Sequence, residues 1–431
     1  MRLKSRKTLF SFGAILLVLL LGASPVMAIV TNDEFTATTS KSFDFDKSKK
    51  GTKNVILLVG DGMGQSAITA ARWEKAGKNL GTYATTRLSM DSMEHSCTVL
   101  TYAADSFITD SSSAGTAFAC GEKTDNGVVC QDQTAVFRVS NGRNLTSILE
   151  LAGKSGRATG LVSTTRITHA TPAVFYAHIN DRDNETVIAE QLLESKVNVA
   201  YGGAAAYFVP KGSKDPFGKS SKRTDSRDLT AEAQSLGYKV IYNTTGMSSL
   251  APSDRKVIGL FNSSHMAYEI ERAGTTEPSL SEMTESSIRI LSQDKDGFFL
   301  MVEGGRIDHA GHARLSGAEI QDTLEFDDAV KVALDYAKRT DTLVLVTADH
   351  ETGGLSLGAM NAADYTAGMI PTYGSGLDIT GGYGSIIPAS EATHTAVDVP
   401  LFISGPKSDR ICHGPIDNTQ IYTAMRYAMR V

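Results

Sequence analysis

Short apolar runs alternate with amphipathic helical patterns along most of this chain of 431 residues. Runs such as "NVILLV", "FFLMV" and "TLVLV" contain no polar alternation, which is typical of strands buried on both faces. Longer stretches with helical spacing lie between the runs, and one of them carries an apolar stripe made of Phe326, Val330, Ala333, Leu334 and Ala337. This alternation predicts an α/β fold with a mostly parallel central sheet and helices on both of its faces.

The first 28 residues have the features of an export signal. A basic start precedes an apolar run of about fourteen residues, shorter than the roughly 20 that span a bilayer, and a small-residue site ends at Ala28. The alternative is an anchor that stays in the membrane. We expect residues 1–28 to be a signal peptide of a secreted or periplasmic protein, 29–50 to be a flexible leader, and 51–431 to form a single domain.

The charge of the chain limits its partners. Segment 1–28 has four basic residues and no acidic ones, so its removal would change the net charge from −6 to −10. A protein this acidic has no general attraction for nucleic acid or for an anionic membrane. If it acts on an anion, local positive charges must capture that anion.

Four cysteines permit three disulfide pairings in an exported protein. Cys120 and Cys130 are the simplest pair to close, but the sequence leaves Cys97 and Cys412 open as partners. No CxxC or Cys/His zinc-finger spacing occurs. Any zinc would therefore be held by histidine and carboxylate.

Acidic side chains follow three of the predicted strands. Asp61, Glu303 and Asp349 stand at or just after the apolar runs, and His350 follows Asp349. Ligands of open α/β sheets bind beyond the carboxyl ends of the strands. One such aspartate could be a helix cap or a turn residue, but three carboxylates together with histidines predict a shared metal site.

Further possible metal ligands lie in two short segments. In "VEGGRIDHAGH", Asp308 and His312 are four residues apart, so a helical turn would direct both toward one ion. His394 lies in the loop "EATHTAVDVP". Nitrogen and carboxylate ligands suit zinc, whereas Glu303 with a hydroxyl and water would suit magnesium. The isolated histidines His95, His265 and His413 are interpreted as structural.

Two other segments could bind and attack a phosphoryl group. "TDSSSAGTAFACG" places a hydroxyl at the predicted start of a helix, where backbone N–H groups stabilise anions. The alternative is that Asp110 or Ser111 only caps this helix. "STTRITHATPAVFYAHINDR" supplies His169, Thr171 and Arg182, and an arginine can bind two phosphoryl oxygens at once.

Taken together, these motifs resemble the alkaline phosphatase family over nearly all of residues 53–415. The segments "GDGMG", "TDSSSAGTA", "HATPA" with "AHINDR", "VEGGRIDHAGH", "TADHETGG" and "THTAVDVP" occur in the order of that family. The resemblance implies a three-layer sandwich of alkaline-phosphatase type and an exported, homodimeric enzyme. It implies hydrolysis of small phosphate monoesters through a phosphoserine.

The resemblance also implies the roles of individual residues. Ser111 would be the nucleophile, because the family's serine directly follows the aspartate, and Arg182 would bind phosphate. Two zinc ions and one magnesium ion would share the remaining residues. One zinc would bind Asp61, Asp349 and His350, the other Asp308, His312 and His394, and magnesium would bind Asp61, Thr171 and Glu303.

The sequence departs from the best-known enterobacterial members, which carry Asp at the position of His169 and Lys at that of His309. These two histidines are expected to contact metal-bound water or phosphate and to influence the choice of the third metal. Only 43 residues separate His350 and His394, so the large insertion of the animal enzymes is not expected. The alternatives are a phosphodiesterase or sulfatase of the same fold, although no Cys/Ser-x-Pro-x-Arg motif occurs, and a non-enzymatic metal or phosphate binder.

Overall fold

The computed structural model describes residues 51–361, 364–374, 377–378, 387–388 and 391–431. The predicted signal peptide and leader, residues 1–28 and 29–50, lie outside this part of the chain. Within it, no helix has both the length and the apolar character needed to cross a bilayer.

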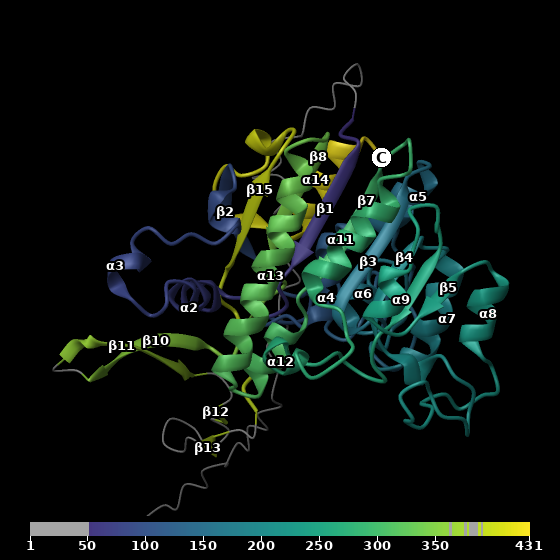
Figure 1. Cartoon of the computed structure of the whole chain (residues 1–431), viewed down its shortest axis with the longest axis horizontal. Coiled ribbons are helices and arrows are strands. Elements are labelled where there is room, and N and C mark those ends of the chain that lie inside the picture. The colour runs from purple at the N-terminus through teal and green to yellow at the C-terminus, as the bar shows by residue number, and fades with distance from the viewer. Residues whose placement is uncertain (1–50, 362–363, 375–376, 379–386, 389–390) are drawn as a thin grey trace, which may run out of the picture. The chain divides into compact units, whose positions relative to one another are not determined.

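A ten-stranded sheet forms the centre of the fold (Figure 1). The strands from β8 through β1, β7, β3, β4 and β6 to β5 are parallel to one another. In contrast, β15 runs antiparallel to its neighbours β2 and β8. Across the sheet, the order is β16 (Ile416–Asp417), β2 (His95–Leu100), β15 (Val399–Ser404), β8 (Thr342–Thr347), β1 (Asn54–Val59), β7 (Phe298–Glu303), β3 (Ala158–Arg166), β4 (Val199–Gly203), β6 (Val257–Leu260) and β5 (Lys239–Ile241). All side chains of β1, β7 and β8 are buried, as the unbroken apolar runs predict.

Helices cover the sheet, and Figure 1 shows α11 and α13 crossing in front of its strands. The longer helices are α2 (Gln65–Lys75), α4 (Ser111–Cys120), α5 (Ile148–Lys154), α7 (Glu185–Ser195), α8 (Leu229–Ser235), α11 (Leu280–Leu291), α12 (Arg306–His312), α13 (Ser316–Ala337) and α14 (Thr419–Met429). The shorter ones are α3 (Leu80–Tyr83), α6 (Ala170–Ala173), α9 (Thr244–Ser248) and α10 (Glu269–Arg272). The predicted mostly parallel α/β fold with covering helices is confirmed.

Local signals account for where several helices begin. Ser147 and Glu150 form a reciprocal capping box at the start of α5, and Ser279 and Glu282 form another at α11.

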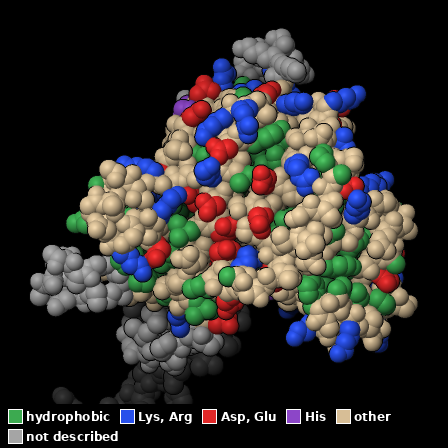
Figure 2. Space-filling model, viewed as in Figure 1, with side chains coloured by type: hydrophobic (Ala, Val, Ile, Leu, Met, Phe, Trp, Pro, Cys, Tyr) green, Lys and Arg blue, Asp and Glu red, His purple; other side chains and the backbone are tan. Residues whose placement is uncertain are grey.

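Acidic side chains gather along the middle of the face that α13 occupies (Figure 2), in agreement with the negative net charge.

The glycine-rich segment 355–390 is weakly patterned, which predicts a long surface excursion rather than a second domain. In its described part, β10 (Leu355–Asn361) and β11 (Asp364–Tyr373) form an antiparallel pair, and β12 (Leu377–Asp378) pairs with β13 (Ile387–Pro388). The expectation missed these strands because glycine and alanine weaken the alternation that marks a strand. The β10–β11 pair is fastened to α13 by the Tyr373 hydroxyl, which donates to the buried Glu319 Oε2 at 2.6 Å.

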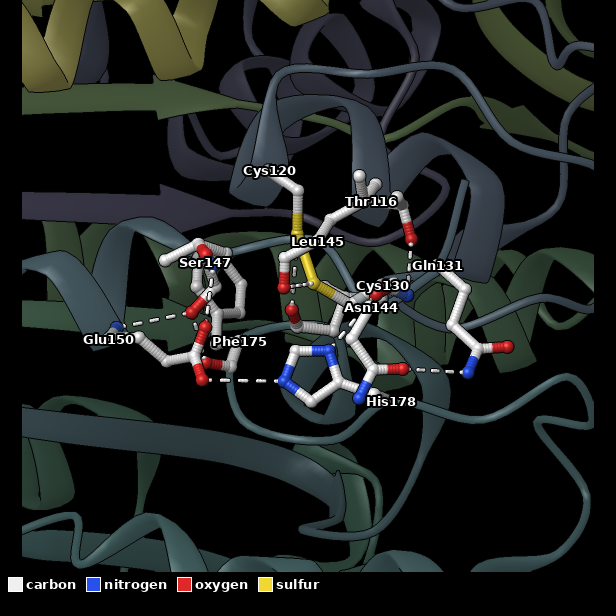
Figure 3. Close-up of a disulfide and its surroundings, with 12 residues drawn as sticks. Thr116, Cys120, Cys130, Gln131, Asn144, Leu145, Ser147, Glu150, Phe175 and His178 are labelled. Carbon is white, nitrogen blue, oxygen red and sulfur yellow. Dashed lines mark hydrogen bonds and ion pairs between the residues drawn. A yellow bond between two sulfur atoms is a disulfide. The ribbon is translucent and has the colours of Figure 1, made fainter. Parts of the chain in front are cut away.

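Two disulfides connect the four cysteines. Cys97 of β2 pairs with Cys412, with 5.5 Å between the Cα atoms, and Cys120 at the end of α4 pairs with Cys130. Around the second disulfide, the His178 ring lies between the Cys130 carbonyl at 3.0 Å and the Glu150 carboxylate at 3.3 Å (Figure 3). The pair that was simplest to close from the sequence is therefore formed.

Glu319 makes the stability of the fold depend on pH. Burial raises the pKa of Glu319 to about 8, whereas its pKa in the unfolded chain is about 4.5. The protonated carboxyl therefore contributes fully to the free energy of unfolding below about pH 4.5, and this contribution is lost as pH rises through about 8. Because of this loss, the free energy of unfolding of the wild type should fall between about pH 5 and 9. Glutamine cannot ionise, so in Glu319→Gln this fall should be smaller by about 1–3 kcal/mol. Denaturant titrations across this range measure the change.

Glu194→Gln, at an exposed position of α7, is the matched control and should leave the pH dependence as it is. An unaltered pH dependence in Glu319→Gln would contradict the account of this buried carboxyl.

Candidate active site and metal centre

Most of the predicted site residues lie in segments that follow four neighbouring parallel strands. In the register of the sheet, Val59 of β1 lies opposite both Thr347 of β8 and Glu303 of β7, and Glu303 lies opposite Ser163 of β3. The carboxyl ends of β8, β1, β7 and β3 therefore meet along one edge of the sheet. The segments that leave these ends carry the carboxylates and histidines singled out in the sequence.

Asp61, Asp349 and His350 form a fully buried group. His350 Nε2 lies 3.1 Å from Asp349 Oδ2 and 3.7 Å from Asp61 Oδ1. The other oxygen of Asp349 accepts hydrogen bonds from the backbone N–H groups of Gly62 at 3.1 Å and His350 at 2.9 Å. The backbone thus fixes this carboxylate with one oxygen free.

Asp308, His312 and His394 converge in the same way. Asp308 Oδ1 lies 3.3 Å from His312 Nε2 and 3.5 Å from His394 Nε2, and these two nitrogens are 3.0 Å apart. Each ring donates its Nδ1–H to a backbone carbonyl, that of Ala392 for His312 at 2.6 Å and that of Thr109 for His394 at 2.9 Å. Such a bond leaves the Nε2 lone pair free to bind a cation.

A third group surrounds Glu303. One oxygen of Glu303 accepts hydrogen bonds from Ser163 and from Thr165, the latter at 3.2 Å. Glu303 also lies with Asp61 and His169 in a cluster of possible metal ligands, and its other oxygen, Oε1, has no hydrogen-bond partner among the described residues. Thr171, two residues after His169, is also fully buried on α6. Neither Ser163 nor Thr165 was singled out from the sequence, although both stand in the hydroxyl-rich segment "STTRIT".

The unpaired polar atoms of these groups fit bound cations. Among the described residues, the buried side-chain atoms without a hydrogen-bond partner include both oxygens of Asp61, Asp349 Oδ2, Glu303 Oε1, Thr171 Oγ1 and His169 Nδ1. Each such atom costs about 1–3 kcal/mol. Oxygen and imidazole nitrogen donors suit zinc and magnesium.

The charges in the cluster lead to the same conclusion. Burial, followed by repulsion from Asp349, Asp308 and Glu303, raises the pKa of Asp61 well above its usual range. Burial also raises the pKa of Glu303 to about 7. Bound divalent cations would offset this repulsion and keep the carboxylates ionised.

Ser111 is the first residue of α4, and its hydroxyl contacts the group formed by Asp61, Asp349 and His350. Ser111 Oγ lies 3.3 Å from His350 Nε2. The next two hydroxyls turn away, because Ser112 Oγ donates to both oxygens of Asp110 and Ser113 Oγ contacts Asp110 and Asn126. Geometry therefore separates Ser111 from the two serines that follow it.

Asp110 does more than cap α4. It accepts a hydrogen bond from the Ser113 N–H at 2.9 Å, as the alternative reading of this stretch predicted, and it also binds Arg182 Nη1 at 2.8 Å. Burial alone would raise the pKa of Asp110. The opposing effect of Arg182 and the Ser113 N–H is larger, so the pKa of Asp110 lies well below its usual range. The ionised Asp110 thus holds the Arg182 guanidinium at the N-terminus of α4.

Three histidine rings lie together next to the Glu303 group. The ring centroids of His169 and His309 are 5.5 Å apart, and His265 is 4.3 Å from His309. Burial lowers the pKa of His309 to about 3 and that of His169 well below its usual range, which favours the neutral form of both rings. His265, interpreted as structural from the sequence, thus neighbours the site, and its isolated position in the chain gave no sign of this.

Gly62 has a conformation and surroundings that exclude a side chain. Its φ is +68°, and a Cβ would lie 2.6 Å from Thr352 Oγ1 and 2.9 Å from the Asp308 Cα. Gly77 has nearly the same φ, +66°, but nothing lies within 4 Å of its Cβ position. Both glycines therefore have a positive φ that disfavours other residues, but only at Gly62 would an added Cβ collide with neighbouring atoms.

Gly62→Ala is expected to lower the free energy of unfolding by about 1–3 kcal/mol more than Gly77→Ala does, because overpacking adds to the backbone strain. Chemical denaturation of the two variants and the wild type measures the difference. Equal losses would show that the neighbourhood of Gly62 is not crowded.

Comparisons with known proteins agree with this geometry. Residues 52–374 match the family model described as alkaline phosphatase. The chain is 33% identical to the tissue-nonspecific alkaline phosphatase of Felis catus, over 87% of this chain and 83% of that protein. It is 32% identical to an alkaline phosphatase of Gadus morhua, over 92% and 96%.

Solved structures give the same result. Alkaline phosphatase from the Antarctic bacterium TAB5 superposes with a TM-score of 0.74 and 32% identity, covering 89% of this chain and 99% of that one. A mutant of the TAB5 enzyme has Mg bound in its M3 site. The enzyme from a psychrophilic Shewanella species superposes with a TM-score of 0.70 and 29% identity, over 87% and 99%. The chain belongs to the alkaline phosphatase family.

Proposed function

We propose that this protein hydrolyses phosphate monoesters at a site that holds two zinc ions and one magnesium ion. The observation that carries the proposal is the set of unpaired buried oxygen and nitrogen atoms in the carboxylate and histidine groups, together with the Ser111 hydroxyl, which contacts His350 of one of these groups. Asp61, Asp349 and His350 would hold one zinc, and Asp308, His312 and His394 the other. Asp61, Thr171 and Glu303 would hold magnesium.

When bound, these cations would supply Lewis-acid activation of hydroxyl groups and neutralisation of phosphoryl charge. Ser111 Oγ attacks phosphorus, the bond to the leaving alcohol breaks, and a phosphoserine forms. Water then attacks the phosphoserine from the opposite side and releases phosphate. Two in-line displacements give net retention at phosphorus.

Arg182 binds two oxygens of the transferring phosphoryl group, where charge develops during the reaction. Asp110 orients it through the 2.8 Å bond to Nη1, and its Nη2 lies 3.2 Å from His169 Nε2. His169 and His309 stay neutral because of burial and neighbouring charges. They act as polar contacts of bound water or phosphate.

We also propose that the enzyme is exported after cleavage of residues 1–28 and works as a homodimer on small molecules. Export is supported by the basic and apolar start of the chain and by the two disulfides, which persist in oxidising compartments. The homodimer rests on the family resemblance alone.

Ser111→Ala is expected to lower kcat for nitrophenyl phosphate by about 10³-fold or more, because the nucleophile is removed. Inorganic phosphate should still bind, since Arg182 and the cations remain, and calorimetry measures this binding. Ser112→Ala is the matched control, and it should lose less than about tenfold because Ser112 only supports Asp110. Full turnover by Ser111→Ala would contradict the proposed nucleophile.

The wild-type enzyme should hydrolyse nitrophenyl phosphate faster than bis-nitrophenyl phosphate, because Arg182 and three cations favour the doubly charged monoester. Chelation should abolish turnover, and zinc and magnesium added back separately should each restore part of it. Faster hydrolysis of the diester would favour the phosphodiesterase alternative.

A further inference from the structure

The hydroxyl of Thr352 connects the two proposed zinc sites. Thr352 lies on β9 (Glu351–Thr352), with 1% of its surface exposed. Its Oγ1 is 2.5 Å from Asp308 Oδ1 and 3.2 Å from His350 Nδ1. Asp308 and His350 belong to different zinc sites in the proposal above, so one side chain contacts a ligand of each.

The position of the protons follows from the chemistry of the three groups. A hydroxyl has one proton, and the carboxylate of Asp308 can only accept it. At its other contact the Thr352 oxygen must then accept, so His350 carries a proton on Nδ1. The lone pair of that ring is left on Nε2, which lies 3.1 Å from Asp349 Oδ2 and 3.3 Å from Ser111 Oγ.

The surroundings fix the Thr352 side chain in this position. Its backbone N–H donates to the Gly62 carbonyl at 3.1 Å, and β9 pairs with β14 (His394–Thr395) so that Thr352 lies opposite His394. A Cβ on Gly62 would lie 2.6 Å from Thr352 Oγ1, and one on Gly311 would lie 3.1 Å from its Cγ2. Two glycines therefore leave just enough room for a threonine.

We propose that Thr352 is a positioning residue for both zinc sites, because its hydroxyl orients the Asp308 carboxylate and selects the His350 tautomer that leaves Nε2 free for the metal. The inference rests on the proposed function in that the ions are zinc. Thr352 is not itself one of the proposed metal ligands. Loss of a residue that hydrogen-bonds to metal ligands typically changes metal affinity by about 10–100-fold.

The test compares zinc affinity in three variants by competition with a chelator of known affinity, with bound zinc measured by elemental analysis. Thr352→Val keeps the shape but removes the hydroxyl, and it should bind both zinc ions about 10–100-fold more weakly. Thr352→Ser keeps the hydroxyl and should restore most of the affinity. Thr284→Val removes a buried hydroxyl whose one hydrogen bond within the described part of the chain is to the Leu280 carbonyl of α11, and it should match the wild type.

Wild-type zinc affinity in Thr352→Val would overturn the inference, as would equal losses in Thr352→Ser and Thr352→Val, since packing would then explain the effect. Weakening of a single zinc would overturn the shared role. Circular dichroism of the metal-free variants checks folding, and Thr352→Ala provides the same comparison if valine is not accommodated. If the wild type bound no zinc, the proposed function itself would fail before any variant was compared.

Discussion

The burial of four carboxylates at one edge of the sheet, together with their mutual repulsion, is the constraint on which the rest of the site depends. Asp61, Glu303, Asp308 and Asp349 are each at most 3% exposed, and they meet at one edge of a sheet whose strands are otherwise apolar. Uncompensated buried charge of one sign is strongly destabilising, and the raised pKa values of Asp61 and Glu303 express that cost. In the proposed function, cations held among these side chains would offset that cost.

The sheet provides the rigid frame for this arrangement. β8, β1, β7 and β3 are parallel neighbours, so residues about 290 positions apart in the chain meet at their carboxyl ends. A surrounding layer of hydrogen bonds then orients each ligand. Backbone N–H groups hold Asp349, backbone carbonyls hold His312 and His394, and hydroxyls hold Glu303. Ordered ligands lose little further entropy on binding a metal, which favours a preformed site.

Much of this could be predicted from the sequence, for identifiable reasons. Unbroken apolar runs indicated buried parallel strands, and acidic residues at their ends indicated one shared edge. The sequence did not reveal partners that become neighbours only through folding. Asp110 looked like a helix cap yet also binds Arg182, His265 looked isolated yet packs against His309, and Thr352 had no distinguishing pattern. The β10–β11 pair was missed because its strands are rich in small residues.

Anomalous X-ray scattering at the zinc edge, from crystals grown with zinc, tests most directly whether the scattered residues converge on cations. Two peaks are expected, one about 2.0–2.2 Å from side-chain atoms of Asp61, Asp349 and His350, and one at the same distance from Asp308, His312 and His394. Both should lie near the Ser111 hydroxyl. Crystals with no peak at these residues, or with zinc bound elsewhere and Ser111 remote from it, would contradict the account.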